Sequence, residues 1–187
     1  MAETMKVLGI SGSLRKGSYN TALLHEAKKL LPEGMELEIY DLSSLPLYNF
    51  DLDNENPPEA VKQLRDHIRS ADALLIATPE YNYSIPGVLK NALDWASRPA
   101  KSSALNGKPL AMMGAGGLMG TSRAQYHLRQ VAVFTNMFPI NKPEIFVTYA
   151  SQKFDANGNL TDEIARQLIK ELLVALADWT RRLKAKP

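Results

Sequence analysis

Five short apolar segments alternate with five amphipathic segments along the chain, and this alternation limits the fold more than any other feature. Strands are expected at residues 6–10, 37–40, 73–77, 110–113 and 146–149. Helices are expected at about residues 20–31, 58–71, 86–98, 122–138 and 162–183. This order and spacing predict an α/β fold, a five-stranded parallel sheet with helices on both faces.

The third expected strand, Ala73–Ala77, is apolar throughout, as is typical of a central strand that helices cover on both faces. The chain has 187 residues, of which 45% are hydrophobic. That length suits one domain with a sizeable core, so we predict a single domain over residues 1–187. The last helix is expected to begin after Thr161 as its N-cap.

Charge and composition exclude several classes of function. The formal net charge is +2, and no dense cluster of Lys and Arg is present to follow a phosphate backbone, so we expect no nucleic acid partner. The chain has no cysteine, and its three histidines fall on three different expected helices, so no metal site is predicted. No apolar run approaches the roughly 18 residues of a membrane span, and no signal peptide is visible, so we expect a cytoplasmic protein without a membrane partner.

The segment after the first strand, residues 11–21, combines glycines, hydroxyl side chains and two cations at the start of a helix. A helix N-terminus presents unpaired N–H groups and a partial positive charge, and Arg15 can add a charge-assisted hydrogen bond. Two glycines have the spacing of a nucleoside-triphosphate loop, but Ser18 stands where that motif requires lysine. A monophosphate is therefore the expected ligand. The alternative is an ordinary strand–helix turn that Ser18 or Asn20 caps.

The segment after the third strand, residues 78–87, offers two flat side chains, Tyr81 and Tyr83, with Asn82 between them. An amide side chain has a donor and an acceptor, which suits the edge of a ring that carries C=O and N–H groups. The alternative is a core tyrosine beside a proline-initiated helix. After the fourth strand, four glycines in residues 114–121 would let a ligand approach the backbone, or would simply give flexibility. Together the three segments predict a pocket for a phosphate and a planar heterocycle, a combination that FMN provides.

Two motifs carry a resemblance to a known family. They are Gly12-Ser13-Leu14-Arg15-x-Gly17-Ser18-x-Asn20 and Pro79-Glu80-Tyr81-Asn82-x-Ser84-x-Pro86-Gly87-x-Leu89-Lys90-Asn91-Ala92-x-Asp94-Trp95. The chain resembles the NADPH-dependent FMN reductase family, and within it the bacterial chromate, quinone and azo reductases. The resemblance extends from about Lys6 to the last helix. It implies a flavodoxin-like fold with strand order 2-1-3-4-5 and non-covalently bound FMN.

The resemblance also implies which residues hold the cofactor. The phosphate end of FMN would lie at Ser13, Arg15, Ser18, Tyr19, Asn20 and Thr21. The isoalloxazine and ribityl region would lie at Pro79, Glu80, Tyr81, Asn82, Tyr83 and Gly116. It further implies a homodimer or homotetramer with the active site beside the subunit interface.

The implied activity is NAD(P)H-dependent reduction of small acceptors, namely quinones, chromate, azo compounds or free flavin. NADPH or NADH would pass a hydride to N5 of FMN, and the acceptor would then use the same site, which predicts ping-pong kinetics. Because the flavin carries the chemistry, no catalytic side chain is assigned.

Two rival functions use the same fold. A flavodoxin-type electron carrier resembles acidic proteins that dock on basic partners, and a sequence pI of about 8.7 argues against it. A flavin-based redox sensor could use the apolar loop at residues 45–52 for a partner, although self-association is the simpler use of that loop.

Overall fold

The computed structural model describes residues 4–185 and contains one parallel sheet. Its longer strands are β1 (Met5–Ser11), β2 (Met35–Tyr40), β3 (Ala73–Ala77) and β4 (Pro109–Ala115), and two short strands are β5 (Phe138–Pro139) and β6 (Ile145–Val147). The α-helices are α1 (Tyr19–Lys29), α2 (Glu59–Ser70), α3 (Gly87–Ala96), α4 (Ser122–Thr135) and α5 (Glu163–Lys184). Short 3-10 turns lie at Phe50–Leu52, Ala100–Ser102 and Ala150–Gln152.

The strand order is β2-β1-β3-β4-β5, with every pair parallel, so the predicted flavodoxin-like order is confirmed. The prediction of five strands is wrong, because β5 and β6 both pair with β4 along the same edge. The expected helix at 122–138 ends earlier, since Asn136 adopts a left-handed backbone (φ 54°) that terminates α4. Residues 138–139 then pair with the start of β4, and β6 pairs with its end.

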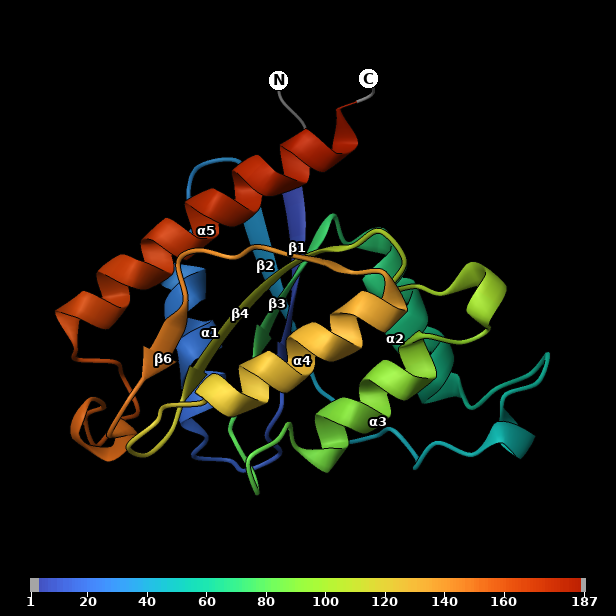
Figure 1. The fold of residues 1–187 in the computed structure, drawn as a ribbon, viewed down its shortest axis with the longest axis horizontal. Coiled ribbons are helices and arrows are strands. Elements are labelled where there is room, and N and C mark those ends of the chain that lie inside the picture. Colours follow the sequence, from blue (N-terminus) through green and yellow to red (C-terminus); the bar gives the residue numbers. More distant parts are fainter. Residues whose placement is uncertain (1–3, 186–187) are drawn as a thin grey trace.

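Helices cover both faces of the sheet, as the sequence predicts (Figure 1). On one face, α1 and α5 pack on the alternate residues of β3 that include Leu75. On the other face, α2, α3 and α4 pack on Leu74 and Ile76. Because β3 is buried on both faces, it forms the centre of the core, and the loops that follow its neighbours are held on a rigid support.

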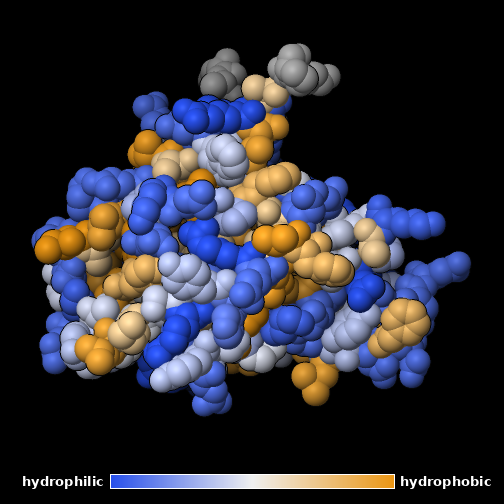
Figure 2. Space-filling model, viewed as in Figure 1, coloured by the Kyte–Doolittle hydropathy of each residue, from blue (hydrophilic) through white to orange (hydrophobic). Residues whose placement is uncertain are grey.

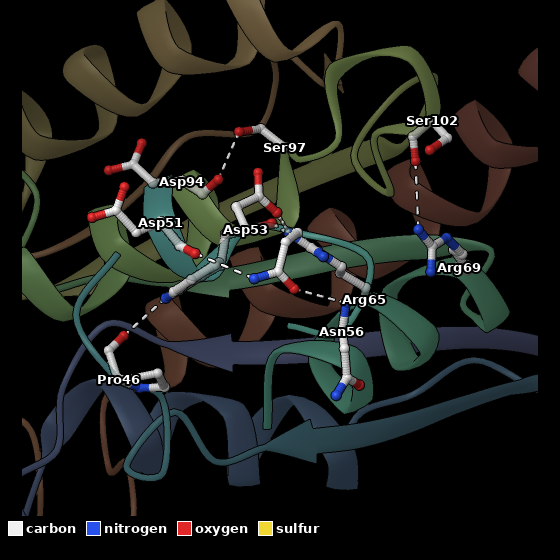
Figure 3. Close-up of polar contacts among 11 residues, drawn as sticks. Pro46, Asp51, Asp53, Asn56, Arg65, Arg69, Asp94, Ser97 and Ser102 are labelled. Atoms are coloured by element: carbon white, nitrogen blue, oxygen red, sulfur yellow. Dashed lines mark hydrogen bonds and ion pairs between the residues drawn. The ribbon is translucent and has the colours of Figure 1, made fainter. Parts of the chain in front are cut away.

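The loop between β2 and α2, residues 41–58, projects from the α3 side of the fold and is firmly anchored (Figures 1 and 3). Arg65 is buried and donates to the Asp53 carboxylate at 2.8 Å and to the Trp95 carbonyl at 3.0 Å. The side chains of Asn91 and Trp95 both donate to the Pro46 carbonyl at 2.9 Å. These bonds fix the loop at Pro46 and Asp53, and the residues between them stay largely exposed.

The N-cap of α5 is Asp162, so the expectation of Thr161 is wrong by one residue. The Asp162 carboxylate accepts a hydrogen bond from the Ala165 amide at 2.8 Å and lies 3.0 Å from the Lys153 ammonium. Both contacts favour the ionised carboxyl group and lower its pKa from the ordinary value of 3.8. The hydrogen bond from the Ala165 amide has the larger effect, and the contact with Lys153 adds to it. Asp162 therefore stabilises the start of α5 as an anion.

We predict that Asp162→Ala lowers the free energy of unfolding by about 1 kcal/mol at neutral pH. A folded-state pKa below the unfolded one gives stability that is present above the unfolded pKa and is lost as pH falls through the folded pKa. The difference between the proteins should therefore shrink below about pH 4. Urea unfolding from pH 3 to pH 7 measures it. Asp162→Asn, which keeps an acceptor oxygen, is the control, and a loss from Asp162→Ala that persists unchanged at pH 3 would contradict this role.

Candidate functional site

The loops that follow β1, β3, β4 and β6 lie side by side at the carboxyl edge of the sheet, at the bottom of Figure 1. Backbone hydrogen bonds tie the start of each of three loops to the end of a neighbouring strand. The Gly12 amide donates to the Ala77 carbonyl at 2.8 Å, and the Thr78 amide donates to the Met113 carbonyl at 3.0 Å. The Gly116 amide donates to the Val147 carbonyl at 3.0 Å. The three segments that the sequence singles out are thus brought to one place, where ligands bind in sheets of this order.

The β1–α1 loop has the features of an anion site. Ser18 caps α1, since its hydroxyl accepts from the Thr21 amide at 3.3 Å, and the Thr21 and Ser11 hydroxyls lie 2.8 Å apart. The first turn of α1 carries no acidic residue, so its partial positive charge is not neutralised from within. Arg15 is exposed, with its guanidinium 5.3 Å from the centroid of the Tyr19 ring.

A hollow of about 370 Å³ lies between this loop and the end of β2. Ser13, Arg15 and Lys16 form one side, and Asp41 and Ser43 belong to the other. Two hydrogen bonds from Ser43 lower the pKa of the Asp41 carboxyl, the one from its hydroxyl more than the one from its amide. Asp41 is therefore ionised at neutral pH. The hollow is therefore cationic on the β1–α1 side and anionic on the β2 side.

The side chain of Asn20 makes its hydrogen bonds within the protein. The residue is buried, its amide group donates to the Ala115 carbonyl at 3.0 Å, and its oxygen accepts from the Ala115 amide at 2.9 Å. This pair of bonds ties the start of α1 to the end of β4. Asn20 can therefore offer a ligand its backbone N–H, which belongs to the helical turn whose amides lack partners within the helix.

The β3–α3 loop folds into a tight turn that holds both tyrosines open. The amides of Tyr81 and Ser84 each donate to the other residue's carbonyl at 3.0 Å. Asn82 and Tyr83 between them have left-handed backbones, with φ of 51° and 66°. The exposed fractions of Tyr81 and Tyr83 are 52% and 65%, so the structure rejects the alternative that they are core residues.

Glu80 points away from solvent and binds the start of α4. Its carboxylate accepts from the Arg123 amide at 3.0 Å, from the Ala124 amide at 3.3 Å and from the Arg123 guanidinium at 2.5 Å. The Arg123 guanidinium in turn lies 3.7 Å from the centroid of the Tyr83 ring. The sequence analysis missed this network, because Arg123 and Glu80 are 43 positions apart and no local pattern joins them.

Gly114 in β4 and Gly116 in the β4–α4 loop are needed by the protein's own packing. A Cβ atom on Gly114 would lie 1.9 Å from the Thr121 hydroxyl, and one on Gly116 would lie 2.3 Å from the Gly120 carbonyl oxygen. Only open space surrounds the equivalent position on Gly117. The closeness of the backbone at Gly116 thus has an explanation without a ligand, and contact between Gly116 and a cofactor stays a prediction.

Exposed hydrophobic side chains occur on each of the loops at this edge. They are Leu14, Tyr81, Tyr83, Leu118, Met119 and Tyr149. In Figure 2, hydrophobic surface appears at the lower left, over the β4–α4 loop. Polar groups of the first loop and apolar groups of the others therefore meet at one edge, an arrangement that suits a ligand with an anionic tail and a flat apolar body.

Two classes of site lack candidates within residues 4–185. No cluster of three His, Cys, Asp or Glu side chains there could hold a metal ion. In the same part of the chain, no helix is long and apolar enough to cross a membrane.

Comparison with known proteins identifies the family. The model of the NADPH-dependent FMN reductase family matches residues 5–152. This chain belongs to the NADPH-dependent FMN reductase family. The family consists of oxidoreductases that depend on FMN and NAD(P)H, so the predicted enzyme class and cofactors are confirmed.

Relatives and solved structures agree with that assignment. An NAD(P)H-dependent FMN reductase of Pseudomonas aeruginosa is 56% identical over 98% of this chain and 100% of its own length. An NAD(P)H:quinone oxidoreductase of Solanum tuberosum is 49% identical over 97% of this chain and 96% of its own. The structure of FerB, a flavoenzyme NAD(P)H:(acceptor) oxidoreductase from Paracoccus denitrificans, has a TM-score of 0.86 and 35% identity, covering 95% of this chain and 98% of that one.

Gly116 and the neighbouring Gly117 differ in the space available for a Cβ atom, so they test the packing argument. We predict that Gly116→Ala lowers the Tm by several degrees, because its Cβ would collide with a backbone oxygen that cannot move freely. Gly117→Ala should leave the Tm within about 1–2 °C of the wild type. Calorimetry of the two variants measures the difference, and equal Tm values for both would contradict the packing argument.

Proposed function

We propose that this chain binds FMN at the carboxyl edge of its sheet and uses NAD(P)H to reduce quinones. One observation carries the proposal: the unneutralised N-terminus of α1 and the exposed tyrosines of the β3–α3 loop lie on adjoining loops that hydrogen bonds connect. Membership of the FMN reductase family supports the cofactor, and the relatives named as quinone oxidoreductases support the acceptor.

The residues at the phosphate end fit FMN. Ser13, Ser18 and Thr21 offer hydroxyls, Arg15 offers an exposed cation, and Tyr19 and Asn20 offer the amides of the first helical turn. The chain lacks the lysine that a triphosphate requires, whereas a single phosphate needs only these donors. We propose that Asn20 also holds this loop against β4 through Ala115.

The residues at the ring end fit an isoalloxazine. Tyr81 and Tyr83 supply aromatic faces, Asn82 supplies a donor and an acceptor, and Pro79 fixes the backbone that enters the turn. Gly116 lies on the neighbouring loop. Glu80 acts on this region by holding the start of α4, because its oxygens already accept hydrogen bonds from Arg123 and Ala124.

When bound, FMN would supply the redox chemistry that links NAD(P)H to an acceptor. The protein's contribution is to anchor the phosphate, to orient the ring, and to leave one ring face open to each substrate in turn. One shared site gives ping-pong kinetics. Chromate, azo compounds and free flavin are proposed as further acceptors of the same site.

The spectrum of the purified protein tests this function against the carrier and the sensor. We expect flavin absorption bands that bleach when NADPH or NADH is added without oxygen and return when a quinone follows. A flavin that neither nucleotide bleaches would favour the carrier or sensor. A protein that neither retains FMN nor takes it up from solution would contradict the proposal.

We propose further that the protein forms a homodimer or homotetramer in the cytoplasm, with the α3–α4 face and the β2–α2 loop in its interfaces. The loop exposes 84% of Leu47 and 73% of Phe50, and α4 exposes 81% of Val133 and 88% of Phe134. A groove of about 690 Å³ lies between α3 and α4, with Phe134 in its lining. Hydrophobic exposure of this extent on adjacent elements supports self-association.

Light scattering of Phe134→Ser and Phe50→Ser variants measures the oligomeric state. We expect the wild type to be a dimer or tetramer at micromolar concentration, and each variant to dissociate at protein concentrations at least about tenfold higher, because an apolar anchor is lost. Ile164→Ser is the matched control, since Ile164 is 75% exposed but lies on α5, across the sheet. A wild type that is monomeric at all these concentrations would contradict the proposal.

A further inference from the structure

The turn at Asn82–Tyr83 has a conformation that its own sequence does not favour. Two consecutive left-handed residues in a two-residue turn are normally glycine, asparagine or aspartate, because other side chains crowd the backbone there. Asn82 meets that preference, but Tyr83, at φ 66°, does not. Contacts outside the turn must therefore favour this conformation, and the structure shows which ones do.

The main contact comes from Arg123, on the first turn of α4. Its guanidinium lies 3.7 Å from the centroid of the Tyr83 ring, well within the range of a cation–π interaction. A second tie lies one helical turn further on, where His127 Nδ1 and the Ser84 hydroxyl are 2.9 Å apart. One face of α4 thus holds both the middle and the end of the turn.

Arg123 is itself held in place by Glu80, whose side chain is only 8% exposed. The Glu80 carboxylate accepts from the guanidinium and from the backbone amides of Arg123 and Ala124. Glu80 directly precedes Tyr81, the first residue of the turn. Arg123 contacts both Glu80 and Tyr83, so it links the start of the turn to its middle. The guanidinium also compensates the charge of a nearly buried carboxylate.

We propose that Arg123 is a positioning residue that preforms the Tyr81–Ser84 turn, and so fixes the ring-side wall of the FMN pocket before the cofactor binds. This inference rests on the proposed function for its ligand, but the preformed turn is a property of the protein without cofactor. A wall that is already ordered reduces the conformational entropy lost on binding, so Arg123 is expected to raise the affinity for FMN without touching the reacting atoms.

The first test measures amide hydrogen exchange by NMR in the cofactor-free protein. In Arg123→Met, the amides of Tyr81 and Ser84 should exchange at least about fivefold faster than in the wild type, because the cation–π contact is lost. Arg129→Met is the matched control: Arg129 lies on the same helix and is equally half-buried, but it donates to the Ile140 carbonyl and to Asn141. Unchanged exchange in Arg123→Met, or an equal increase in the control, would overturn the proposal.

The second test measures FMN affinity from the quenching of flavin fluorescence. Arg123→Met should raise the Kd for FMN at least about fivefold, and Arg129→Met should not. Tyr83→Leu removes the same contact while leaving Glu80 and Arg123 paired, so amide exchange at Tyr81 and Ser84 should rise to a similar extent, and this measurement serves if Arg123→Met does not fold. Its Kd for FMN should rise at least as much as that of Arg123→Met, because Tyr83 is also proposed to face the flavin ring. The double variant should bind no worse than the worse single variant, because one interaction is removed twice.

The outcomes separate this proposal from the proposed function. If the cofactor-free wild type does not bind FMN but exchange is faster in Arg123→Met, the role of Arg123 in preforming the turn stands and the proposed function is wrong. Normal FMN binding in both single variants, or losses that add fully in the double variant, would leave the function in place and overturn the role of Arg123.

Discussion

The position of β3 between β1 and β4 is the constraint on which the rest of this structure depends. Its backbone pairs on both edges, its side chains are buried on both faces, and it therefore cannot shift without breaking the core. The hydrogen bonds that continue past its end, from Gly12 to Ala77 and from Thr78 to Met113, carry this rigidity into the loops. The β1–α1 loop and the Tyr81–Ser84 turn are therefore parts of one supported surface.

The protein uses several polar side chains of its two motifs to build this surface, and leaves other groups for the ligand. The side chain of Asn20 bonds to β4, and that of Glu80 bonds to the start of α4. What stays accessible is the exposed Arg15 together with Tyr81 and the part of Tyr83 that Arg123 does not cover. A site built in this way is ordered by the chain itself, which limits the entropy that a cofactor must overcome on binding.

The layers of the fold and the place of the candidate site can be predicted from the sequence, because short stretches of residues indicate them. Alternating apolar and amphipathic segments predict the layers and the parallel sheet, and the position of the loops after β1, β3 and β4 predicts where the site lies. The division of the last edge into β5 and β6 could not be predicted in this way. It depends on a left-handed Asn136 and on pairing with β4, and two- or three-residue strands have no periodicity of their own.

The contacts between distant segments were also beyond local patterns. Nothing in the motif that contains Glu80 shows that its carboxylate meets Arg123, and nothing near Gly116 shows that its closest neighbour is the Gly120 carbonyl. The first contact follows from how the β3–α3 loop packs on the start of α4, and the second follows from the tight turn within the β4–α4 loop itself. For motif residues of this kind, the contacts within the protein become visible only in the folded chain, and their contacts with a cofactor stay a prediction.

A crystal structure of the protein grown with FMN tests the central claim most directly, because it locates both ends of the cofactor at once. The account predicts the phosphate at the first turn of α1, beside Ser18 and Arg15, and the flavin ring against the Tyr81–Ser84 turn. A flavin seated in the groove between α3 and α4, or a phosphate held away from α1, would contradict it.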